Sequence, residues 1–242
     1  MKPFLSVVIP AFNESSRIVT TLEEVTGYLG SQSYASEVLV VDDGSSDDTV
    51  SLVEAFRSSH PSVKLLRVAH GGKGWAVKNG MLSAEGEYRF LCDADLSMPI
   101  DQVDRFLPPM LEGFEIAIGS REAAGSRRFD EPPMRHFQGR VFNFAVQALA
   151  IRSFSDTQCG FKCFRGDVAA ELFALQRLNG FGFDVEVLFM ARRRGLKVVE
   201  VPIDWYYKPE SKVRPLRDSV GMLKDVAAVR LNQWMGRYAI PR

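Results

Sequence analysis

Short apolar segments alternate with amphipathic segments through the first half of the chain, and this alternation restricts the possible folds more than any other feature. The apolar segments are predicted to be buried strands at Phe4–Ile9, Val38–Val41, Val63–Val68, Tyr88–Cys92 and Ile116–Gly119. The segments between them are predicted to be helices at Ser16–Leu29, Thr49–Ser58, Lys73–Ala84 and Asp101–Glu112. Such alternation is typical of α/β proteins, in which helices cover both faces of a parallel sheet.

The second half of the chain has a less regular pattern. Residues 121–135 form a charged segment with Gly and Pro, which is typical of a long loop beside a functional site. We predict a helix at Arg140–Ile151, a strand at Val198–Val201 and an amphipathic helix at Ser219–Trp234. A chain of 242 residues without repeats or linkers fits one large domain or a domain with a small appendage.

Composition excludes several classes of function. The formal net charge is zero, which gives no electrostatic basis for binding nucleic acid. The three cysteines, Cys92, Cys159 and Cys163, are too few for a disulfide framework and lack the partner ligands of a zinc site. No apolar segment approaches the roughly 20 residues of a membrane span, so we expect a soluble or peripheral protein. The GxSxG and HExxH motifs of hydrolases are also missing.

Polar or glycine-rich residues follow each of the five predicted strands of the first half. In chain order these strand ends read PAFNE, DDGSSDDT, HGGKG, DADLS and GSRE. Because ligands of parallel α/β sheets bind at the carboxyl ends of the strands, the five segments are expected to line one crevice. The sequence therefore predicts the functional site at this edge of the sheet.

The fourth strand end, FLCDADLSMP at residues 90–99, places two carboxylates two positions apart directly after a buried strand. Like charges this close repel each other unless a cation lies beside them. We predict that Asp93 and Asp95 hold Mg²⁺ or Mn²⁺, hard cations that take oxygen ligands and complete their coordination with substrate phosphates. An Asp-rich turn or a cap for the next helix is the alternative interpretation.

Two other strand ends contain candidates for binding a nucleotide. Asp42 directly follows a buried strand, where its carboxylate is suited to accept hydrogen bonds from a nucleobase or a ribose, whereas Asp47 or Asp48 is expected to cap the next helix. Lys73 lies among glycines at a helix start, where backbone N–H groups and a cation suit a phosphate. A solvated lysine at a turn is the alternative, and the segment lacks the spacing of a P-loop.

The ordered motifs SVVIPAFNE, VVDDGSSDDT, GGKGWAVKNGM, CDADLSMP and GSR resemble those of family 2 glycosyltransferases over residues 4–121. In the second half, DTQCGFKCF, FGFDVEVLFMARRRG, VPIDWYY and SKVRPLRDSVGMLKDVAAVR resemble dolichyl-phosphate glucosyltransferases and related polyprenyl-phosphate glycosyltransferases. The resemblance implies a GT-A fold, with a Rossmann-like, mostly parallel sheet flanked by helices and C-terminal amphipathic interface helices. It implies one domain over residues 1–242, with a nucleotide-sugar-binding half at 1–121 and an acceptor-binding half at 122–242.

The resemblance also implies roles for individual residues. The nucleotide sugar is expected to contact Pro10, Ala11, Glu14, Asp42, Lys73, Asp93 and Ala94. Asp93 and Asp95 correspond to the metal-binding DXD pair, and Ser97 stands where mannosyl relatives often have Gln. The acceptor phosphate is expected to contact Arg121, Arg135, Arg140 and Lys212. Asp95, Arg121 and Asp156 are expected to be catalytic, with Asp156 as a base or an orienting group and a structural capping role as its alternative.

The implied reaction is an inverting, metal-dependent transfer of glucose from UDP-glucose to a dolichyl or polyprenyl phosphate. DTQCGF and SKVRP favour the glucosyl group, whereas DADLSMP, in place of that group's usual DADG, leaves GDP-mannose open as the donor. A soluble acceptor and a nucleotide-sugar-binding protein without catalysis are further alternatives. The lipid acceptor implies peripheral association with the cytoplasmic face of a membrane, with residues 141–151 and 219–234 as candidate contacts. Isoprenoid length, the choice of cation and the oligomeric state are left open.

Overall fold

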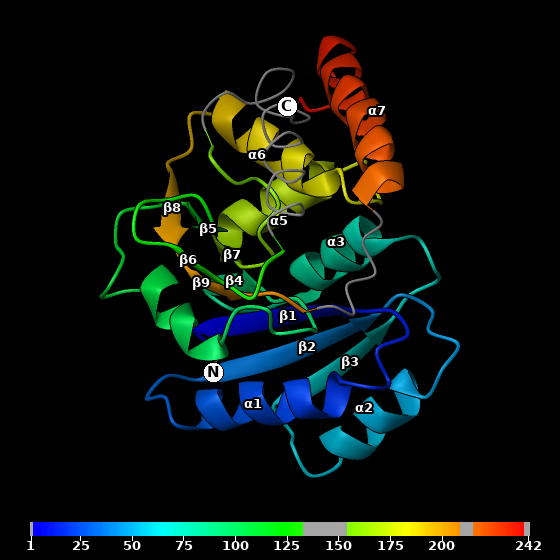
Figure 1. Cartoon of the computed structure of the whole chain (residues 1–242), viewed down its shortest axis with the longest axis vertical. Coiled ribbons are helices and arrows are strands. Elements are labelled where there is room, and N and C mark those ends of the chain that lie inside the picture. The colour runs from blue at the N-terminus through cyan, green and yellow to red at the C-terminus, as the bar shows by residue number, and fades with distance from the viewer. Residues whose placement is uncertain (1, 133–153, 209–214, 240–242) are drawn as a thin grey trace.

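A computed structural model describes residues 2–132, 154–208 and 215–239, which form an α/β structure around a central sheet (Figure 1). Within these residues, seven strands form the sheet in the order β3-β2-β1-β4-β7-β5-β8. Their bounds are Leu5–Ala11 for β1, Ser36–Asp42 for β2, Val63–Arg67 for β3, Tyr88–Leu91 for β4, Ile116–Ser120 for β5, Lys162–Arg165 for β7 and Val198–Pro202 for β8. β7 runs antiparallel to β4 and β5, and the other described pairs are parallel. The expected mostly parallel sheet is confirmed.

Helices cover both faces of this sheet, because its inner strands are apolar on both sides. One layer contains α1 (Ile18–Gly30) and α2 (Thr49–Arg57), and the opposite layer contains α3 (Lys73–Ser83), α5 (Gly166–Leu175) and α6 (Phe183–Arg193). In β1, Val7 and Ile9 belong to the core under the first layer, whereas Val8 belongs to the core under the second. The C-terminal helix α7 (Pro215–Trp234) contacts α6 on the outside of the second layer (Figure 1).

A separate sheet of two parallel strands lies beside the segment that follows β4. It consists of β6 (Arg127–Phe129) and β9 (Asp204–Tyr206), and the rings of Phe129 and Tyr206 stack at 4.5 Å. The Tyr206 N–H donates a hydrogen bond of 2.7 Å to the carbonyl of Ser97. This bond joins the small sheet to the segment that contains the two predicted metal ligands.

The N-terminal half agrees with the sequence analysis, except at its last helix. The five predicted strands and the first three predicted helices are confirmed, and their ends differ by at most two residues. The helix predicted at Asp101–Glu112 is wrong, because a 3-10 helix, η1, spans Ile100–Phe106 and ends there. Leu107 has an extended backbone, since Pro108 and Pro109 follow it. Proline lacks an N–H and disfavours helical backbone in the residue before it.

The C-terminal half contains elements that the sequence analysis did not predict. These are β6, β7, β9, α5 and α6. The strand predicted at Val198–Val201 is confirmed as β8, and the helix predicted at Ser219–Trp234 is confirmed as part of α7, which begins at Pro215. The helix predicted at Arg140–Ile151 lies outside the described residues. In the described part of the chain, no helix combines the length and the apolar character needed to cross a membrane.

Candidate active site

The loops that follow β1 and β2 are tied together by hydrogen bonds. The Asn13 N–H donates to Ser45 Oγ and the Ser46 N–H donates to Asn13 Oδ1, both at 2.8 Å. The Glu14 N–H donates to Thr49 Oγ1, also at 2.8 Å. These bonds form because β1 and β2 are parallel neighbours, so that their polar ends leave the sheet at the same edge.

The predicted nucleotide-binding residues of the first two strand ends meet at this edge. Pro10 and Ala11 end β1, beside Asp42 at the end of β2, and Glu14 lies in the adjoining loop. Asp42 is 1% exposed, and its two carboxylate oxygens lie 3.2 and 3.3 Å from the Ser45 N–H nitrogen, which donates to them. The structure therefore holds Asp42 in a fixed orientation at the carboxyl edge of the sheet.

Asp43 fixes the loop that precedes α3. Its carboxylate accepts hydrogen bonds from Gly71 N–H at 2.8 Å and Gly72 N–H at 2.9 Å, and His70 Nδ1 lies 2.9 Å from it. Gly72 has a φ of +106°, which side chains rarely allow. Asp43 is a positioning residue that the sequence pattern did not single out, although an aspartate buried at a strand end needs donors of this kind.

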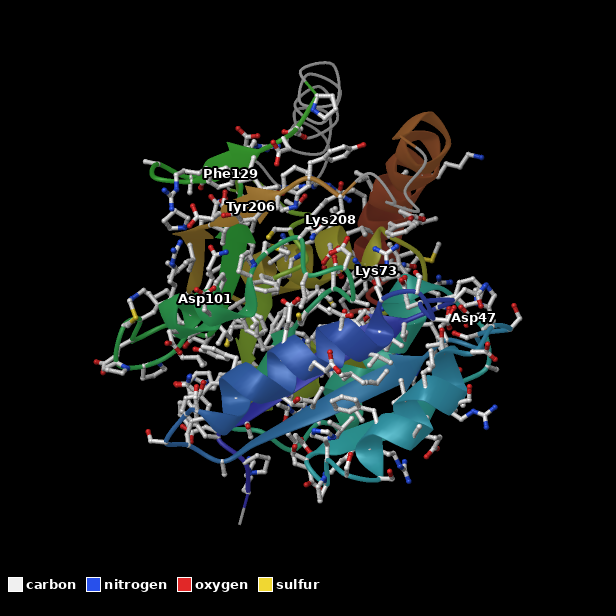
Figure 2. All side chains as sticks on the ribbon, turned by 60° about the horizontal axis from the view of Figure 1, so that its bottom comes forward. Asp47, Lys73, Asp101, Phe129, Tyr206 and Lys208 are labelled. Carbon is white, nitrogen blue, oxygen red and sulfur yellow. The ribbon has the colours of Figure 1, made fainter. Side chains whose placement is uncertain are left out.

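Lys73, the first residue of α3, forms an ion pair with the DXD segment. Its Nζ lies 2.7 Å from Asp93 Oδ1, and each of the two side chains is 25% exposed. Burial alone would lower the pKa of Lys73, but the carboxylates of Asp93 and Asp184 outweigh burial and raise it. Lys73 is therefore a cation at neutral pH. In Figure 2 it lies between the loop that carries Asp47 and the strand that carries Tyr206.

The carboxylate of Asp93 occupies space that only a glycine at position 160 leaves free. A Cβ atom at Gly160 would lie 2.1 Å from Asp93 Oδ2 and 2.5 Å from its Cγ, far inside van der Waals contact. Gly160 is close because β7, which starts at Lys162, is inserted beside β4 and brings its preceding residues to the end of that strand. The antiparallel strand thus defines one wall of the DXD segment.

Asp93 and Asp95 fit a divalent cation that shares its coordination with a substrate. Both residues are partly exposed after β4, and Asp95 Oδ1 accepts a hydrogen bond from the Ser97 N–H at 2.9 Å. Among the described residues, no group of three or more His, Cys, Asp and Glu residues could hold an ion by itself. Two such carboxylates match Mg²⁺ or Mn²⁺, which commonly bind through one or two carboxylates plus substrate phosphates.

A buried ion pair close to the DXD carboxylates escaped the sequence analysis. Lys162 Nζ lies 2.7 Å from Asp184 Oδ1, with the side chains 3% and 7% exposed, and it also donates to the Cys159 carbonyl at 2.5 Å. Burial raises the pKa of Asp184, although Lys162 and Lys73 act to lower it. The signals were a lysine within GFKCF and an aspartate within FDVEVLFM, because charged residues in apolar segments are seldom buried without a partner.

Arg121 and Asp156 form a two-point ion pair after β5. The Arg121 guanidinium donates from Nε to Asp156 Oδ2 at 2.6 Å and from Nη2 to Oδ1 at 2.9 Å. Burial on its own would raise the pKa of Asp156, but the Arg121 cation dominates and holds it at about 2. The guanidinium carbon of Arg121 also lies 5.6 Å from the centre of the Trp205 ring, within cation–π distance.

The structure thus brings most predicted site residues to one sheet edge, on two sides. The donor-side set consists of Pro10, Ala11, Glu14, Asp42, Lys73, Asp93, Ala94 and Asp95. The described residues of the acceptor-side set are Arg121 and Asp156. Arg135, Arg140 and Lys212, which are predicted to bind the acceptor phosphate, lie outside the described residues.

Comparison with solved structures supports the fold expected from the motifs. Glucosyl-3-phosphoglycerate synthase from Mycobacterium tuberculosis in complex with UDP superposes with a TM-score of 0.67 at 20% identity, over 99% of this chain and 82% of that chain. A structure of the same enzyme with Mn²⁺ and UDP-glucose gives a TM-score of 0.64 over 99% of this chain and 80% of that chain, at 19% identity. This similarity shows the GT-A-like fold.

Comparison with characterised sequences identifies the family. Dolichyl-phosphate beta-glucosyltransferase of Dictyostelium discoideum is 31% identical over an alignment of 255 positions, which covers 98% of this chain and 77% of that protein. The enzyme of the same name from Saccharomyces cerevisiae is 32% identical over an alignment of 260 positions, which covers 97% of this chain and 76% of that protein. The family model for Glycosyl transferase family 2 matches residues 6–173. The motif resemblance is confirmed, and the chain is a glycosyltransferase that belongs to glycosyl transferase family 2.

Proposed function

We propose that this protein transfers glucose from UDP-glucose to the phosphate of a dolichyl or other polyprenyl phosphate, with inversion at the anomeric carbon and with Mg²⁺ or Mn²⁺. The observation that carries the proposal is the arrangement of charges at the sheet edge. The Asp93 and Asp95 carboxylates stand beside the Lys73 cation on one side, and Arg121 is held by Asp156 on the other. The names of the relatives with more than 30% identity supply the sugar and the lipid.

On the donor side, Asp93 and Asp95 would hold the cation and Lys73 would contact the diphosphate. The cation would act as a Lewis acid that stabilises the charge developing on the nucleotide diphosphate as it leaves. Pro10, Ala11, Glu14, Asp42 and Ala94 would line the nucleotide position, as the family motif implies. Asp42, already fixed by the Ser45 N–H, is suited to orient the base or the ribose.

On the acceptor side, a phosphate monoester has a second pKa of about 6, so it is largely a dianion at neutral pH and needs little help from a general base. We assign Arg121 to bind this phosphate, with Arg135, Arg140 and Lys212 completing the set. Asp156 is then a positioning residue for Arg121. Both of its oxygens accept bonds from that guanidinium, and its low pKa makes it a weak base.

The lipid chain of the acceptor requires contact with a membrane surface, and we propose that the protein associates peripherally with the cytoplasmic face. At the end of α7 and just after it, Leu231, Trp234 and Met235 are 48%, 84% and 45% exposed. Their spacing of three and four residues puts them on one side of the helical turn. Exposed apolar residues of this kind, with tryptophan among them, suit the headgroup boundary of a bilayer.

We propose that residues 1–242 act as one domain with a donor half and an acceptor half. A GDP-mannose donor is the second candidate, because DADLSMP differs from the DADG usual in glucosyl relatives. A phosphorylated soluble acceptor is the third, because the structures with the same fold include complexes with phosphoglyceric acid. The sequence relatives, which are more similar than the structural ones, favour the lipid acceptor.

A transfer assay on purified protein tests the proposal. Radiolabelled UDP-glucose, GDP-mannose and UDP-GlcNAc are each offered with a polyprenyl phosphate and Mg²⁺ or Mn²⁺, and the organic phase is counted. We expect metal-dependent lipid-phase label from UDP-glucose, and its loss in Asp95→Ala. Label from GDP-mannose instead would keep the mechanism and change the sugar. Label that appears only in phosphorylated soluble acceptors would overturn the lipid assignment.

A further inference from the structure

Glu186 is a fully buried carboxylate that the donor and acceptor sites do not use. It lies on α6, is 0% exposed, and accepts three hydrogen bonds from outside its own helix. Oε2 accepts the N–H groups of Arg177 at 3.0 Å and Leu178 at 2.8 Å, whereas Oε1 accepts the hydroxyl of Tyr238 at 2.6 Å. One side chain therefore joins the loop before α6 to the segment that follows α7.

The loop that Glu186 holds lies directly against the turn that carries Lys73. The Trp75 N–H donates to the Asn179 carbonyl at 3.0 Å, and a Cβ at Gly72 would lie 2.7 Å from the same oxygen. A Cβ at Gly74 would lie 2.7 Å from the Gly180 carbonyl. The two backbones are thus in contact with no side chain between them, so a displacement of residues 177–180 moves the turn at 72–75.

Gln176 makes a second link between the same two segments. Its side chain is 2% exposed, and its Nε2 donates to the Gly74 carbonyl at 2.8 Å and to the Leu178 carbonyl at 2.7 Å. The Gln176 carbonyl accepts from Lys78 Nζ at 2.7 Å. The loop and the start of α3 are therefore one hydrogen-bonded unit.

Helix α7 and the segment that follows it contact the loop at residues 177–180 and the start of α6. Tyr238 also accepts a hydrogen bond from Asn232 Nδ2 at 3.3 Å, which fixes its ring relative to α7. Asp225 on α7 accepts the N–H of Gly182 at the start of α6, and a Cβ at Gly182 would lie 2.4 Å from its Oδ2. Two separate contacts thus connect α7 to the segment between Arg177 and Glu186.

We propose that Glu186 and Tyr238 are positioning residues for donor binding, and that α7 sets the place of Lys73 through them. The path runs from Tyr238 to Glu186, through residues 177–180 to the turn at 72–75, and from Lys73 to Asp93. This inference rests on the proposed role of Lys73 toward the donor diphosphate. Helix α7, which is proposed to contact the membrane, would then be linked by this chain of contacts to the nucleotide-sugar side of the site.

The test compares two substitutions that remove one hydroxyl each. Tyr238→Phe deletes the hydrogen bond to Glu186. Tyr28→Phe deletes a hydrogen bond of 2.5 Å from α1, in the opposite helix layer, to Asp104 on η1. We expect Tyr238→Phe to raise the Kd for UDP with Mn²⁺, measured by calorimetry, about five-fold to ten-fold. Tyr28→Phe should leave that Kd within two-fold, and the KM for polyprenyl phosphate should stay unchanged in both variants. Equal Kd values for UDP in the two variants would contradict the proposal.

Amide hydrogen exchange in the absence of nucleotide tests the path itself. Tyr238→Phe should speed exchange at the amides of Arg177, Leu178 and Trp75, and Tyr28→Phe should not. Glu186→Gln should restore much of the protection lost in Glu186→Ala, because the amide oxygen still accepts the two backbone N–H groups. Unchanged exchange at Trp75 in Tyr238→Phe would overturn the path. Absence of UDP binding in the unmodified protein would instead refute the proposed function, so the two failures are distinguishable.

Discussion

Lys73 Nζ and Asp93 Oδ1 lie 2.7 Å apart, so a cation from the start of α3 already neutralises one of the two carboxylates of the DXD segment. If Asp93 holds a divalent cation as proposed, that cation would compete with Lys73 for the carboxylate until the donor diphosphate gave Lys73 a second anionic partner. On the proposed function, the ion pair would therefore couple metal binding to nucleotide binding.

Lys73→Met distinguishes the effect of Lys73 on metal binding from its effect on nucleotide binding. Without the lysine, the affinity of the protein alone for Mn²⁺, measured by EPR titration, should rise several-fold, because Asp93 is released from the ion pair. The affinity for UDP with Mn²⁺ should fall at least about ten-fold, since a charge-assisted phosphate contact is lost. Lys64→Met, which removes the Lys64–Glu37 pair, serves as the control and should change neither value. A fall in both affinities would contradict the competition.

Gly160→Ala should weaken metal binding at the proposed site of Asp93 and Asp95. The new Cβ would meet Asp93 Oδ2 at 2.1 Å, so the carboxylate must rotate away from its present position. We expect Mn²⁺-dependent UDP binding to weaken at least about ten-fold, because metal ligands must be placed within a few tenths of an ångström. Gly27→Ala is the matched control, since a Cβ there meets nothing within 4 Å. Unaltered UDP binding in Gly160→Ala would show that Asp93 does not need this position.

Arg121→Lys should affect the acceptor more than the donor. Lysine cannot form the two-point contact with Asp156 or present a planar fork to a phosphate. The KM for polyprenyl phosphate should rise by about ten-fold or more, and the KM for the nucleotide sugar should change by less than about two-fold. Arg165→Lys, which breaks an exposed two-point pair with Asp167, controls for the exchange of arginine for lysine as such. Equal increases in both KM values would contradict the assignment of Arg121 to the acceptor phosphate.

Asp156→Asn should have an effect on stability that depends on pH. The pKa of Asp156 is lowered from 3.8 to about 2, so the ionised carboxylate stabilises the folded protein above pH 3.8 and this contribution disappears as the pH falls toward 2. Urea unfolding followed by tryptophan fluorescence should show the variant about 2 kcal/mol less stable at pH 7. The difference should shrink between pH 4 and pH 2.5. A difference that stays constant over this range would mean that ionisation of Asp156 does not stabilise the folded protein.

Much of the donor side could be predicted because its information is local. Each strand of the first half is a short apolar run followed by its own polar residues, and parallel pairing brings those ends together. The placement of Asp42, Lys73, Asp93 and Asp95 at one sheet edge could therefore be predicted without knowledge of their contacts. It found the charges but not their pairing, because the partner of Asp93 comes from a helix that starts 20 residues earlier (73 to 93).

The second half could not be predicted in the same way because its structure depends on distant contacts. β7 is a strand of four residues that contains the buried Lys162, which is tolerated only because Asp184 reaches it from α6. The buried residues of α6 are continuous from Phe183 to Ala191 and include Asp184 and Glu186, so the helix lacks a simple apolar face. At Asp101–Glu112 the helical pattern was present, and two prolines overrode it.

The place of β7 has a consequence for how the chain acquires its fold. Within the described residues, β5 pairs with β7 and β8, both of which follow it in the chain by more than 40 residues. During synthesis, β1 to β4 can therefore assemble early, whereas β5 has no strand to join until residues 162–165 have left the ribosome. A fragment that stops at residue 121 would expose the edge of β4 and would lack the Gly160 wall beside Asp93. The proposed donor half and the proposed acceptor half thus share one sheet, because β7 pairs with both β4 and β5.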